Sequence, residues 1–432
     1  MLAFLAGLAG LWLLRAWANS ALPPFPPHSY WYEWFLHPAP GEIAFFTRYL
    51  VGSIPVLLLL TWGATPWVSN AVKRIDEPHV PFKILLAVAC VWVAGAIAFL
   101  SWGVLGGQVV TADEYAYVFQ GEVLLKGRAA VPAAPMPEFL ENGFVVTRNG
   151  RWFGQYPPGH PLLLTPGLLV GVPRMMPIWL GVCNTLLLGV LLARFVGRKW
   201  ALLGVLLLVT SPLFLLTGST LLSHSSAAFA LGLAALGSLV VWNRDGAWRG
   251  ILAGLGFGLA VITRPWTGIT LAIFPGLILA WAVVRRGRRR ALVSATLTFL
   301  VFCGFFLLYN QQVTGDPFVT GYQAHKGLGE IEFGFGTIFS GTHDHTPAQG
   351  FKNAGILALR FLFWACGWSM ALLFCVFACM RAETTVNTGR KSFFSGQKLA
   401  LGAVIMLVVG FLSAVPYWAT GVNDTGPVKT YE

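Results

Sequence analysis

An adjacent pair of acidic residues, Asp113 and Glu114, follows shortly after the uncharged, apolar run 84–108. A carboxylate held at the mouth of a helix bundle can act as a general base toward a substrate that lives in the membrane. Asp113 and Glu114 are therefore candidate site residues. The alternative is a solvated acidic pair at a helix end. The following residues predict a helix with Asp113, Tyr117 and Gln120 on adjoining turns, so Tyr117 and Gln120 join the candidate site.

Further along the same polar stretch, a rigid segment carries two more candidate side chains, Tyr156 and His160. Three prolines and one glycine within residues 155–161 fix an irregular backbone. Either ring could contact a substrate or anchor the chain at the membrane interface. The apolar piece 162–173 is too short to cross a bilayer comfortably, so we expect it to lie at the interface or to re-enter the membrane. Upstream, Asn149-Gly150 between short apolar runs predicts a hairpin.

Arg264 is a further candidate, because it follows the short apolar run 251–263 and precedes a full span. An arginine inside a membrane costs about 2.5–3.5 kcal/mol on insertion scales, so it needs a partner or a function. A lipid phosphate is a natural partner, since a guanidinium grips phosphate with two donors; the alternative is snorkelling to the headgroups. His224 stands at another expected helix end, as a substrate-binding candidate or in a structural role.

The polar stretch after residue 310 contains an acid flanked by two histidines, His343-Asp344-His345. These residues could ligate a divalent metal, but residues two apart do not share a helical face and a site would need further ligands. We therefore expect no cofactor, with a divalent metal as the alternative. All six cysteines fall inside expected spans, which predicts neither a disulfide framework nor a zinc site.

The composition is that of a membrane protein. Hydrophobic residues make up 56% of the 432 and charged residues 11%, whereas a soluble domain carries about 25% charged residues. Solid apolar runs favour helices over a barrel. We expect an all-α polytopic membrane protein with about eleven transmembrane helices and two long extracytoplasmic loops, 108–176 and 311–354. The expected spans are 1–17, 46–68, 83–107, 177–196, 200–217, 225–242, 250–263, 265–284, 291–310, 355–380 and 399–419.

Basic residues mark one side of this arrangement. The segments expected on the cytoplasmic side hold 17 of the 29 Lys and Arg but only 4 of the 17 acids, and the run 285–290 gives the strongest signal. Positive residues in short loops mark the cytoplasmic side, so both long loops face outside. The net charge of +12 then reports membrane topology. No basic, aromatic-interleaved soluble surface is visible, so we expect no nucleic-acid partner.

Several motifs together resemble the GT-C superfamily of integral-membrane glycosyltransferases, in the bacterial branch related to protein mannosyltransferases and the lipid A aminoarabinose transferase. The resemblance covers roughly residues 82–432 and leaves 1–81 as N-terminal membrane segments outside it. Its carriers are Asp113 to Gln120, Tyr156-Pro157-Pro158-Gly159-His160-Pro161, Thr263-Arg264-Pro265, Thr314-Gly315-Asp316-Pro317, His345-Thr346-Pro347, and Gly426-Pro427 before Tyr431-Glu432. Their order and their common external side make the resemblance fairly specific.

The resemblance implies a polyprenyl-phosphate-linked sugar as donor and a lipid, glycan or protein as acceptor. Transfer would take place on the extracytoplasmic face of a bacterial inner membrane, among membrane lipids. By resemblance, Asp113 takes the place of the catalytic carboxylate and His345 joins the substrate-binding residues. Arg264 and Lys429 are the candidate cations for the departing lipid phosphate, where charge develops in the transition state.

Two departures from the family pattern lie near the end of the chain. Relatives often have Arg after the late Gly-Pro, where this sequence has Val428-Lys429-Thr430, and they usually continue into more membrane segments beyond the position of Glu432. These departures predict a truncated or incomplete copy. The alternative function is a transporter or flippase of lipid-linked sugars, but such proteins tend to have an internal repeat and broken helices at mid-membrane, which this sequence does not display.

Overall fold

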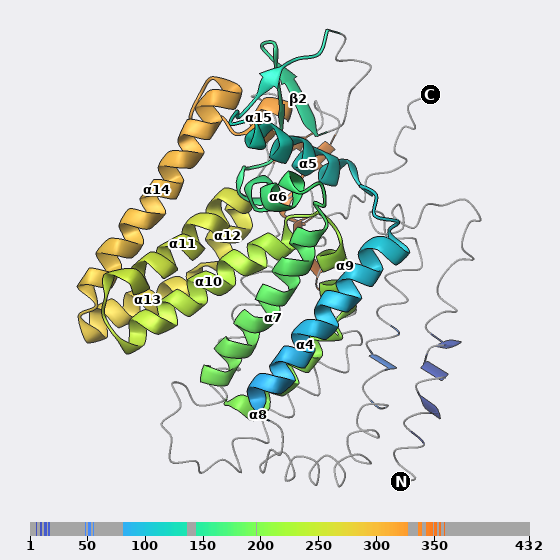
Figure 1. Ribbon diagram of the computed structural model, residues 1–432, viewed down its shortest axis with the longest axis vertical. Helices are drawn as coiled ribbons and strands as arrows, with labels where there is room; N and C mark the ends of the chain where they lie inside the picture. The colour runs from blue at the N-terminus through green and yellow to red at the C-terminus, as the bar shows by residue number, and fades with distance from the viewer. Residues whose placement is uncertain are drawn as a thin grey trace. The chain divides into compact units, whose positions relative to one another are not determined.

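The computed structural model describes residues 81–135, 144–195 and 197–326 continuously and, outside these ranges, only short pieces and single positions. The chain forms two compact units. One comprises residues 82–210 and 214–330, and the other comprises 1–81, 211–213 and 331–432. Most of the described residues belong to the first unit, a helical bundle with a small sheet (Figure 1). The expected division into residues 1–81 and 82–432 stays a prediction.

Four helices of this unit are long and apolar enough to cross a membrane. They are α4 with the π-helical segment η1 (Phe82–Val104), α7 (Met175–Phe195), α10 (His224–Asn243) and α14 (Arg289–Thr314). They correspond to the expected spans 83–107, 177–196, 225–242 and 291–310, which the described part of the chain confirms as apolar helices of spanning length. Together with the composition, these helices identify an integral membrane protein.

Two other expected spans meet at Arg264. The expected span 250–263 corresponds to α11 (Ala247–Thr263), a shorter apolar helix of 17 residues. The expected span 265–284 corresponds to α12 (Pro265–Leu271) and α13 (Ile273–Arg286), which are bent by 47° relative to each other. Pro265 begins α12 at the position where the missing N–H of proline does not matter. The predicted tight connection at Arg264 is therefore present.

The expected span 200–217 is not one continuous helix. It is divided into α8 (Arg198–Val209) and α9 (Pro212–Ser219). Pro212 ends α8 because it disfavours the helical conformation in the residue before it. The expected spans 1–17, 46–68, 355–380 and 399–419 lie, apart from single positions, outside the described residues.

Glycines allow α11 to pack closely against two neighbouring helices. Gly250, Gly254 and Gly258 recur every fourth residue and face α14, where a Cβ on any of them would overlap atoms of that helix. Gly256 lies on the other side, against the backbone of α10. Figure 1 shows α11 between α10 and α14. Small residues let helix backbones approach closely in membranes, and this packing fixes the end of α11 at Arg264.

Residues 112–135, 144–169 and 321–326 form a group of short elements at one end of the bundle (Figure 1). These are α5 (Ala112–Leu125), β1 (Val131–Pro132), β2 (Val145–Arg148), β3 (Arg151–Gly154) and α6 (Gly159–Leu169), with α15 (Gly321–Lys326) against β2. The strands form an antiparallel sheet in the order β1-β3-β2. The predicted hairpin is confirmed: Asn149 and Gly150 have φ of 51° and 68°, as a two-residue type I′ turn requires.

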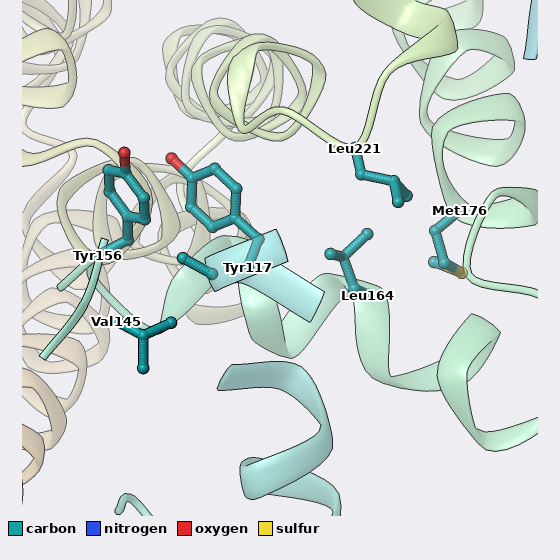
Figure 2. Packing of buried hydrophobic residues seen from close by; sticks show 7 residues of the cluster. Tyr117, Val145, Tyr156, Leu164, Met176 and Leu221 are labelled. Atoms are coloured by element: carbon teal, nitrogen blue, oxygen red, sulfur yellow. The ribbon is translucent and has the colours of Figure 1, made fainter. Parts of the chain in front are cut away.

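A core cluster joins these short elements to the bundle. Its buried members are Ala116, Tyr117, Val145, Tyr156, Leu164, Met176 and Leu221. Figure 2 shows the rings of Tyr117 and Tyr156 side by side, with both hydroxyls at the same end of the pair. The aliphatic side chains hold the rings by apolar packing, which leaves the two hydroxyls for polar contacts.

Candidate active site

Asp113 lies in the first turn of α5, whose start is fixed by a helix cap. Thr111 is extended, and its Oγ1 accepts a hydrogen bond from the N–H of Glu114 at 3.2 Å. The Asp113 side chain is half-buried, and its Oδ1 accepts a hydrogen bond from the hydroxyl of Tyr156. Within the described ranges, Oδ2 has no hydrogen-bond partner. Asp113 therefore keeps one carboxylate oxygen for a ligand.

Two stacked tyrosines connect Asp113 with the core. The ring centroids of Tyr117 and Tyr156 are 4.4 Å apart, with 27° between the ring planes. Burial is the main cause that raises the pKa of Tyr156 above its ordinary value of 10, so the phenol stays protonated and donates to Asp113. The Tyr117 hydroxyl lies 2.9 Å from Oγ of Ser223. Tyr322 of α15 packs its ring edge-on against Tyr156, with centroids 5.4 Å apart.

Both ring nitrogens of His160 are used by the protein. Nε2 lies 2.7 Å from the carbonyl oxygen of Leu221, and Nδ1 lies 2.7 Å from Oγ of Ser226. A carbonyl oxygen only accepts, so Nε2 carries the proton and Nδ1 of the neutral ring accepts from the Ser226 hydroxyl. Burial lowers the pKa of His160 to about 4, with the nearby charge of Arg264 acting in the same direction. The ring is thus neutral near pH 7 and ties α6 to the connection between α9 and α10.

Glu114 is fully buried, and both of its carboxylate oxygens contact the protein. Oε2 accepts a hydrogen bond from the N–H of Val110 at 2.9 Å and lies 3.7 Å from Nη2 of Arg174. Oε1 accepts from the N–H of Leu221 at 3.2 Å. Burial raises the pKa of the Glu114 carboxyl, and the Val110 hydrogen bond and the Arg174 charge oppose that effect.

Arg174, which is only 2% exposed, completes this arrangement. Its Nη1 donates to the carbonyl oxygen of Ser219 at 2.8 Å, and its Nη2 donates to the carbonyl oxygen of Gln108. We call Glu114 and Arg174 the buried clamp. It joins the first turn of α5, the residue before α7 and the connection between α9 and α10, and so fixes the surroundings of Asp113.

Arg264 separates α11 from α12, and its side chain is half-buried. Within the part of the chain that the structure describes, its guanidinium has no hydrogen bond or ion pair. Its charge acts on His160 and on His224, the exposed first residue of α10. Gly159, the first residue of α6, touches the last turn of α11, since a Cβ there would lie 2.8 Å from the carbonyl oxygen of Ile262. The ends of α6, α10 and α11 therefore meet at this point.

A chain of contacts links Asp113 to His160, on which the charge of Arg264 acts. The contacts run from Asp113 through Tyr156 and Tyr117 to His160, in that order. The rings of the last two meet edge-on, with centroids 4.6 Å apart. We call Asp113, His224 and Arg264 the open face, because each is at least partly exposed and keeps polar atoms without a protein partner among the described residues. The structure thus groups six predicted site residues around one another.

The remaining predicted site residues have other surroundings. Gln120 is buried; its Nε2 donates to the carbonyl oxygen of Ala129 at 2.9 Å, and its Oε1 accepts from the N–H of Gly154 at 2.8 Å. His345 lies in β5 (His343–His345), which pairs with β4 (Gly336–Ile338) in the other unit. Lys429 lies outside the described residues.

Among the described residues, no group of three or more His, Cys, Asp or Glu could hold a metal ion.

Three residues of the site were not predicted from the sequence: Arg174, Ser223 and Tyr322. Arg174 carries the same signal that pointed to Arg264, a lone arginine beside a long apolar segment. Ser223 and Tyr322 carry no local signal, because their contacts join segments far apart in the sequence.

No protein-family model and no curated protein sequence matches the chain. Two solved structures of the oligosaccharyltransferase of Archaeoglobus fulgidus are similar to it. The apo form is 14% identical with a TM-score of 0.36, and AglB in complex with an inhibitory peptide and a dolichol-phosphate is 15% identical with a TM-score of 0.35. Each comparison covers 78% of this chain and 56% of the other, so the chain spans about half the length of these proteins. Similarity at this level carries no conclusion about activity.

Proposed function

We propose that this protein is a membrane glycosyltransferase that moves a hexosyl or pentosyl group from a polyprenyl-phosphate donor to an acceptor hydroxyl. The observation that carries the proposal is the open face. Among the described residues, Asp113 keeps an oxygen without a partner and Arg264 has no hydrogen bond or ion pair, and a chain of contacts joins Asp113 to His160, on which the charge of Arg264 acts. Sugar transfer from a phosphate needs both groups: an acceptor for the proton of the nucleophile and a cation for the leaving phosphate.

Asp113 is the general base in this proposal. The acceptor oxygen forms a bond to the anomeric carbon while the bond between that carbon and the phosphate oxygen breaks. The hydroxyl proton moves to Oδ2 of Asp113, and the bonding electron pair leaves with the phosphate. Tyr156 holds the carboxylate through Oδ1, so the free oxygen keeps a fixed orientation toward the acceptor.

Arg264 stabilises the leaving phosphate in this proposal. A guanidinium with no hydrogen bond or ion pair to the described residues can donate two parallel hydrogen bonds to phosphate oxygens. The N-terminal end of α10 at His224 adds the positive end of a helix dipole, and the side chain of Ser223 does not cap it. His160 is neutral near pH 7, so it adds no positive charge for the phosphate. The distribution of basic residues supports an extracytoplasmic open face.

Native mass spectrometry of the protein in mild detergent tests the donor class. We expect a co-bound polyprenyl-phosphate sugar, whose mass would also identify the sugar. A polyprenyl diphosphate that carries an oligosaccharide would instead favour transport or bulk glycan transfer. Ordinary phospholipid as the sole adduct would contradict the proposed donor.

The substitution Arg264→Ala tests the role of the cation. Because a hydrogen bond to a charged group contributes about 1.5–3 kcal/mol, we expect the donor adduct to weaken roughly 10- to 100-fold while the protein accumulates normally. Arg148→Ala, which removes an arginine from the hairpin, serves as the control and should leave the adduct unchanged. An unchanged donor adduct in Arg264→Ala, or a protein that fails to accumulate, would favour a structural role for Arg264.

A further inference from the structure

Arginines gather at the end of the bundle opposite the open face. They lie where α10 ends, α11 begins, α13 ends and α14 begins (Figure 1). The seven residues are Arg244, Arg249, Arg285, Arg286, Arg288, Arg289 and Arg290. The same connecting segments contain a single acid, Asp245, and its Oδ1 accepts a hydrogen bond from the N–H of Ala291 at 3.0 Å. Negative charge within these connecting segments therefore offsets little of this positive charge.

Contacts between the helices join these arginines into one surface. The guanidinium of Arg286 lies over the ring of Trp242, 4.4 Å from its centroid. Nη2 of Arg288 donates to the carbonyl oxygen of Asn243 at 3.2 Å. Trp242 in turn packs edge-on against Trp281, with centroids 5.7 Å apart. The arginines of two separate connections thus lie beside one another and beside tryptophan side chains.

Five of the seven arginines are exposed: Arg244, Arg285, Arg286, Arg289 and Arg290. Like charges held this close repel one another, and three consecutive arginines at the start of α14 stand at the positive end of a helix dipole, where cations are unfavourable. No described carboxylate forms an ion pair with any of these arginines. An anion from outside the chain would relieve this repulsion.

The position of the arginine surface relative to the membrane indicates which anions lie near it. α10 has 20 residues, so its two ends are about 30 Å apart, which is the thickness of a bilayer's hydrocarbon core. His224 lies at one end of α10 and the arginine surface at the other, so the arginines lie at the level of the lipid headgroups. Tryptophans are typical of that level, and arginine binds phosphate with two parallel donors.

We propose that this arginine surface binds the headgroups of anionic phospholipids. The favourable interaction comes from the phosphate and net negative charge of each headgroup, and it does not depend on the donor or the acceptor of the proposed reaction. A zwitterionic lipid offers the phosphate but cancels its charge. The surface should therefore distinguish phosphatidylglycerol from phosphatidylcholine.

The test is native mass spectrometry of the full-length protein in mild detergent, with phosphatidylglycerol and phosphatidylcholine of identical acyl chains added at equal concentration. We expect phosphatidylglycerol adducts to exceed phosphatidylcholine adducts by about tenfold. The triple variant Arg285→Gln, Arg289→Gln, Arg290→Gln should lose most of this preference. The control variant Lys126→Gln, Arg128→Gln, Arg148→Gln removes the same net charge at the other end of the unit and should keep it.

Three results would overturn the proposal. They are a wild-type protein without preference, a triple variant that keeps the preference, and a control variant that loses it equally, since the last would reflect net charge alone. If the triple variant does not accumulate, the single substitutions Arg285→Gln and Arg290→Gln, both at exposed positions, allow the same comparison. Each should reduce the preference by a smaller factor, and an unchanged preference in both would likewise overturn the proposal.

Discussion

The buried clamp and the open face contain the same chemical groups in opposite environments. Glu114 and Arg174 are almost inaccessible, and backbone groups and the partner charge occupy both carboxylate oxygens and both terminal guanidinium nitrogens. Asp113 and Arg264 are half-buried, and each keeps polar atoms without a partner in the described ranges. Asp113 and Glu114 are neighbours in sequence, yet the first turn of α5 leaves Asp113 partly exposed beside Tyr156 and buries Glu114 in the protein.

A buried charge whose partners are a counter-charge and backbone groups stabilises the fold, whereas a partly exposed charge with unpaired atoms is available to a ligand. The buried clamp reaches the connection between α9 and α10 through Leu221 and Ser219. Substitutions in the two regions should therefore have different effects, one on stability and the other on activity.

The largest effect on stability should come from breaking the buried clamp. Arg174→Ala leaves the Glu114 carboxylate buried without its cation, and breaking a buried ion pair typically costs about 3–5 kcal/mol. Thermal unfolding in detergent should therefore show a large decrease in the midpoint. The double variant Glu114→Gln, Arg174→Met removes both charges and should recover part of the loss. Equal loss in the single and double variants would mean that packing, not charge, accounts for the effect.

The buried, neutral ring of His160 should make the stability of the protein depend on pH. The pKa of His160 is about 4 in the folded protein and ordinarily 6.5, so the unfolded chain binds the proton more readily between these values. The stabilisation from His160 is fully present above about pH 6.5 and should be lost as the pH falls toward 4, by about 3 kcal/mol. Unfolding midpoints over this range, compared with His160→Gln, measure it. An equally steep decrease in His160→Gln would contradict the assignment.

The two stacked tyrosines should differ in what the loss of their hydroxyl changes, and these effects should be smaller. Tyr117→Phe removes a contact with Ser223 inside the protein, so we expect a loss of about 1 kcal/mol in stability and little change in turnover. Tyr156→Phe removes the donor that orients Asp113, so turnover should decrease while stability changes by a similar small amount. Each variant removes one phenol hydroxyl from one of the two stacked rings, so each serves as the control for the other. Identical effects on turnover would contradict a positioning role for Tyr156.

Local sequence signals were sufficient for several elements. Asn149-Gly150 fixed the hairpin through turn chemistry, the uncharged run after residue 84 gave a span, and Pro265 with Arg264 marked the connection between α11 and α12. Each depends on neighbouring residues alone. These three local structures could therefore be predicted from the sequence.

The environment of individual side chains could not be predicted in the same way. Glu114 was a candidate for substrate binding, but its burial depends on Arg174 and Leu221, which are 60 and 107 positions away in sequence. His160 likewise depends on Ser226, 66 positions away. No periodicity or motif contains such pairings. The sequence therefore indicated several of the polar residues that gather at one end of the bundle, but not which of them are paired.

The most direct test of the account compares Asp113→Asn with Glu114→Gln. Each replaces one carboxylate with an amide of the same size at adjacent positions, and the readouts are the unfolding midpoint and the release of polyprenyl phosphate from the lipid-linked donor in membranes. Asp113→Asn should lower turnover about 10²- to 10⁴-fold with an unchanged midpoint. Glu114→Gln should lower the midpoint by on the order of 10 °C and keep turnover in the protein that remains folded. Retained turnover in Asp113→Asn, or the same pattern in both variants, would contradict the account.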